Sequence, residues 1–141
     1  MYLIQIHSSF AYIVLALVFI FIISIFFSYL GKKRPSTVTK KLGLFAIIFT
    51  HIQVLIGIVQ YFIFSPKGIS MVSNEAFSMS NASMRLLVVE HPIAMLVGAT
   101  LLTITYSKIK RMKSNTTLGI FLLGLAAAAL LFSRIPYAVW L

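Results

Sequence analysis

Four apolar segments, each long enough to cross a bilayer as a helix, dominate the sequence; they cover residues 9–30, 42–64, 86–106 and 118–137. A spanning α-helix needs roughly 20 apolar residues, because the hydrocarbon core is about 30 Å thick. Hydrophobic residues make up 60 % of the 141 residues and charged residues only 10 %. A soluble domain of this length cannot bury so much apolar surface. The sequence therefore predicts one all-α integral membrane domain, residues 1–141.

The basic residues indicate how these spans are oriented. Nine of the twelve Lys and Arg lie in the connections 31–41 and 107–117, whereas the connection 65–85 holds only Lys67 and Arg85. Basic loops stay in the cytoplasm. We therefore expect an up-down-up-down four-helix bundle in the bacterial inner membrane, multi-pass, with the 65–85 loop and both termini outside, in the periplasm. Because the net charge of +10 is concentrated in loops, we expect the lipid bilayer as a partner and no nucleic acid.

Two further features of composition narrow the possibilities. The chain has no cysteine, which excludes disulfides, thiolate metal sites and a covalently attached c-type heme. Small residues in the third and fourth segments predict close helix packing there; they are Gly98, Ala99, Gly119, Gly124 and the run LAAAAL.

Ionisable residues inside the predicted spans are the candidates for a functional site, because a charge at that depth is costly. Glu90 and His91 should lie roughly 6–8 Å below the outer boundary, and Arg134 roughly 5 Å below it. His7 lies at the outer mouth of the first span. These four residues are expected to form one layer, in which Glu90 pairs with Arg134. His51 should lie deeper, roughly 20 Å from the outer end of its helix.

The histidines predict a cofactor site. A b-type heme in a helix bundle needs two imidazoles that point inward from facing helices. His91 and His7 meet this condition on the first and third spans, and His51 is the alternative ligand to the heme iron. Arg85 and Arg134 would hold the heme propionates, while Glu90 would orient Arg134 or a ligand imidazole.

Pro92 follows the candidate ligand directly. A proline inside a helix has no N–H to donate to the carbonyl four residues earlier, so we expect the carbonyl of Val88 to be free and this helical turn to be loosened.

Three functions stay open on the residues alone. The first is a heme-b-binding subunit for electron transfer or heme handling, as part of a larger respiratory assembly with other membrane subunits. The second is a cofactor-free accessory or structural subunit of a membrane complex. The third is a quinol or proton site at Glu90 and His91, where a carboxylate adjoins an imidazole. The short loops offer little water-soluble surface, so we expect a non-catalytic subunit rather than an enzyme on its own.

The chain resembles a family of small bacterial four-helix membrane proteins commonly labelled cytochrome B, through the stretches HSSFAYIVLAL, FAIIFTHIQVLIGIVQYF, MRLLVVEHPIAMLVGATLLTITYSKIKR and SRIPYAVWL. The resemblance runs over nearly the whole chain. The layout is also similar to one half of heme A synthase, in which histidines near the outer ends of two helices hold a heme. On that resemblance His7 and His91 match the paired ligands. That enzyme has a carboxylate four residues before its first histidine, where this chain has Leu3, and a second bundle, so heme oxidation by this chain alone is not implied.

Overall fold

A computed structural model describes the backbone of residues 2–140 and the side chains of residues 2–138. The described residues form helices and no strand, which confirms the predicted all-α class. Their order is α1 (Tyr2–Leu30), α2 (Thr37–Val59), the π-helical turn η1 (Gln60–Phe64), the 3-10 turn η2 (Ile69–Ser73), α3 (Ala82–Arg85), the π-helical turn η3 (Leu86–Glu90), α4 (His91–Arg111), α5 (Leu118–Ser133) and α6 (Tyr137–Trp140).

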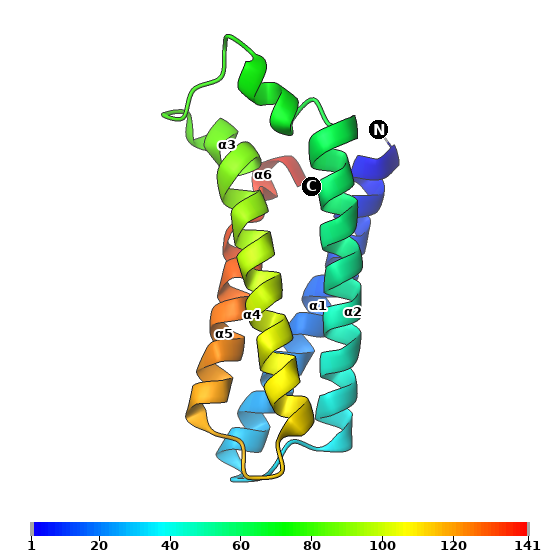
Figure 1. Ribbon diagram of the computed structural model, residues 1–141, viewed down its shortest axis with the longest axis vertical. Coiled ribbons are helices and arrows are strands. Elements are labelled where there is room, and N and C mark those ends of the chain that lie inside the picture. Colours follow the sequence, from blue (N-terminus) through cyan, green and yellow to red (C-terminus); the bar gives the residue numbers. More distant parts are fainter. Residues whose placement is uncertain (1, 141) are drawn as a thin grey trace.

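The four long helices form a bundle in which consecutive helices run antiparallel (Figure 1). Both α1 and α4 pack against α2 and α5, so α1 and α4 face each other across the diagonal, as the sequence predicts. The connections 31–36 and 112–117 lie together at one end, here called the connection end (Figure 1). Segment 65–81, α6 and the start of α1 lie at the opposite end, here called the termini end.

The helix starts follow from local capping chemistry. The side chain of Ser36 accepts a hydrogen bond from the backbone N–H of Thr39, and Thr117 does the same for Ile120. Such caps satisfy N–H groups that have no partner inside the helix. Both capping residues stand in the polar connections, so the polar sequence between apolar runs also sets where α2 and α5 begin.

Three helical segments are long and apolar enough to cross a membrane: 2–30, 37–73 and 82–111. The fourth predicted span, 118–137, is wrong at its end, because α5 stops at Ser133. Its 16 residues correspond to about 24 Å of helix, less than the roughly 30 Å of a hydrocarbon core. Pro136 explains the stop, since a proline disfavours helical backbone in the residue before it and cannot donate a hydrogen bond itself. Arg134 therefore lies after the helix and not within it.

The fully buried side chains gather in the middle of the bundle and toward the connection end. Phe21, Ile25, Leu102 and Ile109 are all completely inaccessible to solvent. The glycines predicted to permit close packing divide into two groups: a Cβ at Gly98 or Gly124 would lie 2.9 Å from a side chain of a neighbouring helix, whereas Gly119 faces open space. The prediction is thus confirmed for the first two and wrong for Gly119.

The termini half of the bundle is packed differently. The first buried residue of α1 is Val14, and the last buried residue of α2 is Thr50. Between these residues and the termini end, α1 and α2 have no buried side chain, although both helices continue for several turns. The core therefore ends where a cavity begins.

Candidate functional site

The cavity at the termini end has a volume of about 560 Å³. Its walls come from α1, α2, η3 and α4, and residues of the 65–72 segment and of the chain after α5 complete it. Small-molecule and cofactor sites in proteins have volumes of about 300–1,000 Å³ and are mostly apolar with a few polar groups. In size and lining this cavity belongs to that class.

His7 and His91 both line the cavity, and their rings lie next to each other. Their ring centres are 6.3 Å apart, and their ring planes are nearly perpendicular, at 88°. His7 comes from α1 and His91 from the first residue of α4, the two helices on the diagonal. The structure therefore brings together the two histidines that the sequence placed in one layer.

The backbone holds the imidazole of His91 in a fixed orientation. Its Nδ1 lies 2.9 Å from the carbonyl oxygen of Arg134, in the segment after α5. When Nδ1 carries the proton and donates it to that carbonyl, Nε2 keeps a free lone pair. Histidines that bind metals commonly have this arrangement, because the second hydrogen bond fixes the tautomer and the ring.

His7 is positioned by α2. The side-chain amide of Gln53 donates a hydrogen bond of 2.8 Å to the backbone carbonyl of His7. Gly57, one helical turn further, leaves room for the ring, because a Cβ there would lie 3.1 Å from Cε1 of His7. Any larger residue at position 57 would therefore push against the imidazole.

In the turn that precedes His91, the carbonyl of Val88 has no N–H donor four residues later, because residue 92 is a proline. The backbone of η3 widens to a π-helical turn, and the N–H of His91 donates to the carbonyl of Leu86. The carbonyl of Val88 instead accepts a hydrogen bond of 2.8 Å from the hydroxyl of Tyr61 in η1. Tyr61 thus satisfies the carbonyl that proline leaves without a partner and ties the two π-helical turns together.

Replacing Tyr61 by phenylalanine should therefore destabilise the bundle modestly. We expect the free energy of unfolding to fall by about 1 kcal/mol, because the Val88 carbonyl loses its partner while the ring is kept. Equilibrium unfolding in detergent measures this. Tyr29→Phe is the matched control, since the Tyr29 ring stacks on Phe121 and its hydroxyl makes no hydrogen bond to the described residues. Equal stability of the Tyr61→Phe and Tyr29→Phe variants would contradict this role for Tyr61.

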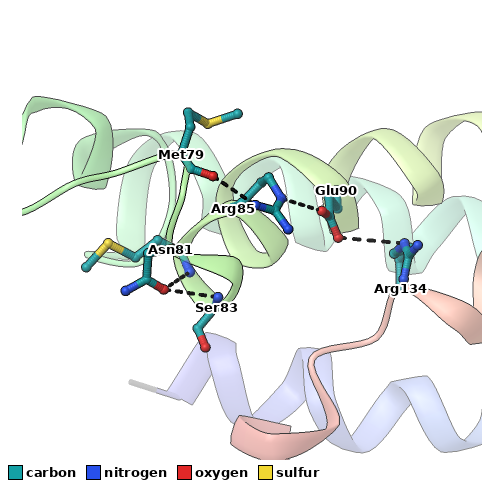
Figure 2. Close-up of polar contacts among 7 residues, drawn as sticks. Met79, Asn81, Ser83, Arg85, Glu90 and Arg134 are labelled. Atoms are coloured by element: carbon teal, nitrogen blue, oxygen red, sulfur yellow. Dashed lines mark hydrogen bonds and ion pairs between the residues drawn. The ribbon is translucent and has the colours of Figure 1, made fainter.

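Glu90 links two arginines from different parts of the chain (Figure 2). One carboxylate oxygen accepts a hydrogen bond of 2.7 Å from Nε of Arg85, and the other lies 3.7 Å from Nε of Arg134. The predicted pair between Glu90 and Arg134 is present, but the shorter contact is to Arg85. Arg85 also donates a hydrogen bond of 2.9 Å to the carbonyl of Met79.

These contacts change the roles expected for the arginines. The side chains of Arg85 and Arg134 surround Glu90, and neither lies on the cavity wall, where Lys67 is found instead. Through Glu90 they fix the segment whose carbonyl holds His91. Glu90 thus contacts the side chain of Arg134, and the backbone carbonyl of Arg134 lies within hydrogen-bond distance of the His91 imidazole.

His51 lies apart from the other two histidines. Its Nδ1 is 2.6 Å from the carbonyl of Ile47, its Nε2 is 3.3 Å from the hydroxyl of Thr103, and its side chain is on the exposed surface of the bundle. It does not line the cavity. His51 therefore has the contacts of a residue that bridges α2 and α4.

The cavity wall also carries polar atoms without partners. Among the described residues, four buried side-chain polar atoms have no hydrogen bond: Nδ1 of His7, Oγ1 of Thr50, Oε1 of Gln53 and Oε1 of Gln60. All four residues line the cavity. Because buried polar groups are nearly always hydrogen-bonded, this grouping indicates that the cavity accommodates a molecule with polar groups.

Tyr61, Gln53 and Gly57 were not predicted from the sequence as parts of the site. The spacing from His51 to Gln53 and Gln60 shows a polar series on α2, but only the rotation of that helix decides which members face the cavity. No group of three or more His, Cys, Asp or Glu side chains suited to a metal ion occurs in the described part of the chain.

Comparisons with protein-family models, with curated proteins and with solved structures find no match to this chain. The geometry described above is consequently the basis for any functional assignment.

Proposed function

We propose that the chain is a membrane-spanning heme-b protein whose iron ligands are His7 and His91. The observation that carries this proposal is the pair of imidazoles, with ring centres 6.3 Å apart, that line a cavity of cofactor size. Heme, when bound, supplies one-electron chemistry. The residues of this chain supply the ligands, their orientation and a largely apolar enclosure, which are the means by which a protein tunes such a group.

The separation of the rings agrees with two ligands to one iron. If His7 and His91 both held one iron, a metal–imidazole bond of about 2.0 Å and a ring radius of roughly 1.1 Å on each side would allow ring centres up to about 6 Å apart. The observed separation of 6.3 Å matches this. The small residue Ala11 on the cavity wall would leave space for a macrocycle, and Lys67 would supply a cation for its carboxylates.

In the membrane, the termini end would face the periplasm and the connection end the cytoplasm. This orientation follows from the nine cations of the two short connections. A heme near the periplasmic face suits electron transfer or heme handling within a respiratory assembly. The many exposed large apolar side chains of the bundle would contact lipid and other membrane subunits.

The quinol or proton hypothesis is less favoured. A proton-accepting carboxylate needs to be free to change its charge, whereas Glu90 is held between two guanidinium groups and lies outside the cavity lining. The cofactor-free accessory subunit remains the alternative. That hypothesis assigns no role to the paired histidines or to the polar side-chain atoms of the cavity that have no hydrogen bond.

An optical spectrum of the chain, purified after expression with sufficient heme supply, tests the proposal. We expect the reduced-minus-oxidised bands of a low-spin b-type heme at one heme per chain. A colourless, monodisperse preparation that takes up no added heme would reject the proposal and favour the accessory subunit.

A further inference from the structure

A second candidate site lies at the connection end, the end of the bundle opposite the one near His7 and His91. It begins with an imbalance of charge. The nine cations of this end are Lys32, Lys33, Arg34, Lys40, Lys41, Lys108, Lys110, Arg111 and Lys113. The only acidic side chains of the sequence are Glu75 and Glu90, both toward the termini end, and the two ion pairs between described side chains both involve Glu90. The cations of the connection end therefore depend on counterions from outside the chain.

Three of these cations line one open groove. The groove has a volume of about 760 Å³ and lies between the last turns of α4, the 112–117 connection and the start of α5. Lys108, Arg111 and Lys113 stand on its wall together with the hydroxyl-bearing residues Ser107 and Ser114. Cations and hydroxyl donors gathered in one concave site are the groups that bind a phosphate.

Most of the rest of the groove is apolar. Ile104, Met112 and Ile120 lie on the wall together with Thr103, whose hydroxyl donates a hydrogen bond to the carbonyl of Ala99. Ile104 lies one turn before Lys108, toward the middle of the bundle. The site is thus amphipathic along the helix axis, with charge at the end of the bundle and apolar side chains deeper. A phospholipid has the same order of groups, with its phosphate at the membrane surface and its acyl chains below. An inorganic phosphate would use only the first part.

Hydrogen bonds fix the shape of the connection that closes the groove. The backbone N–H and the hydroxyl of Thr116 each donate a hydrogen bond of 2.8 Å to the carbonyl of Lys33. Thr116 is buried, so this contact joins the 112–117 connection firmly to the 31–36 connection. The groove does not have to be organised by its ligand.

The dipole of α4 is a simpler explanation for some of the positive charge at its C-terminal end. Cations near a helix C-terminus interact favourably with a partial negative charge equivalent to about half an elementary charge. Three cations in one groove, together with Lys110 of the same turn, exceed that need several-fold. The remaining cations, which are exposed, are available to an anion.

We propose that this groove binds the headgroup of an anionic phospholipid of the surrounding membrane leaflet. The phosphate would lie among Lys108, Arg111 and Lys113, and the upper part of an acyl chain would lie along Ile104 and Ile120. Clusters of cations directly adjoining a membrane helix commonly recognise anionic lipids in this way. This inference does not depend on heme binding.

Lipid binding to the purified full chain in neutral detergent tests the inference. Phosphatidylglycerol and phosphatidylcholine with identical acyl chains are added, and bound lipid is counted by native mass spectrometry. The variant Lys108→Gln/Arg111→Gln/Lys113→Gln removes three charges from the groove. The control Lys32→Gln/Lys33→Gln/Arg34→Gln removes three charges from the other connection. Gel filtration verifies that both variants are monodisperse.

We expect phosphatidylglycerol to bind in preference to phosphatidylcholine, and the groove variant to lose about tenfold or more of that affinity while the control loses about threefold or less. Equal losses in the two variants would overturn the inference, because they indicate diffuse charge attraction. The absence of a preference for the anionic lipid would do the same. So would displacement by inorganic phosphate at concentrations similar to the lipid, since that result assigns the site to free phosphate.

Discussion

The His91→Ala variant is expected to lose the low-spin heme spectrum completely. His91 is the proposed ligand whose Nδ1 lies against the carbonyl of Arg134, so its removal would take away both a proposed iron ligand and the contact to the segment after α5. His7→Ala should also lose the low-spin bands, because one imidazole cannot give six-coordinate low-spin iron without a second strong ligand. Pyridine hemochrome assays and reduced-minus-oxidised spectra on equal amounts of monodisperse protein measure both effects.

His51→Ala is the matched control for these two variants. It removes an imidazole of the same chemistry from α2, but one that contacts Ile47 and Thr103 outside the cavity. We expect its heme content and spectrum to equal those of the unaltered chain. Loss of heme in His51→Ala, with heme retained in His7→Ala, would show that the ligand pair is His51 with His91 and would contradict the geometry proposed above.

The Gly57→Leu variant should fold but bind heme poorly. A Cβ at position 57 already lies 3.1 Å from Cε1 of His7, and the remaining atoms of leucine would extend into the cavity and displace the ring. Changes that disturb the orientation of a metal ligand reduce affinity by roughly 10- to 100-fold, and we expect a loss of heme affinity in that range. Heme titration of the apoprotein, followed by absorbance, gives the affinity.

Gly119→Leu controls for the effect of adding the same side chain to a membrane helix. The only neighbouring atom within 4 Å of a Cβ there is Oγ1 of Thr117, at 3.9 Å, in the first turn of α5 far from the cavity. Its heme affinity should be unchanged. If the Gly57→Leu variant bound heme as tightly as the Gly119→Leu variant, the cavity at the termini end would not be the heme site.

Much of the fold follows from the pattern of apolar and polar segments. Apolar runs separated by short basic connections dictate four antiparallel helices, and the connections also contain the capping residues Ser36 and Thr117. The end of α5 was missed because hydropathy continues through Ile135 and Tyr137, while the backbone responds to Pro136. Hydropathy describes the preference of side chains for lipid, whereas helix termination depends on backbone hydrogen bonds.

The site could be predicted only in part. Depth along a helix is proportional to residue number, so the common level of His7, His91 and Glu90 follows from the sequence. The rotation of each helix about its axis does not, since nearly all faces of these helices are apolar. The contacts of Tyr61 and Gly57 depend on that rotation. Arg85 is nearer to Glu90 than Arg134 is because Arg85 directly precedes η3, the widened turn that ends at Glu90.

Electron paramagnetic resonance of the oxidised protein tests the central claim most directly, since a heme iron held by two imidazoles would give a signal that responds to the relative orientation of the rings. If His7 and His91 hold the iron with their ring planes at 88°, we expect a highly anisotropic low-spin signal. A rhombic low-spin signal typical of parallel imidazole planes, a high-spin signal, or a protein without heme would contradict the assignment of His7 and His91 as a ligand pair.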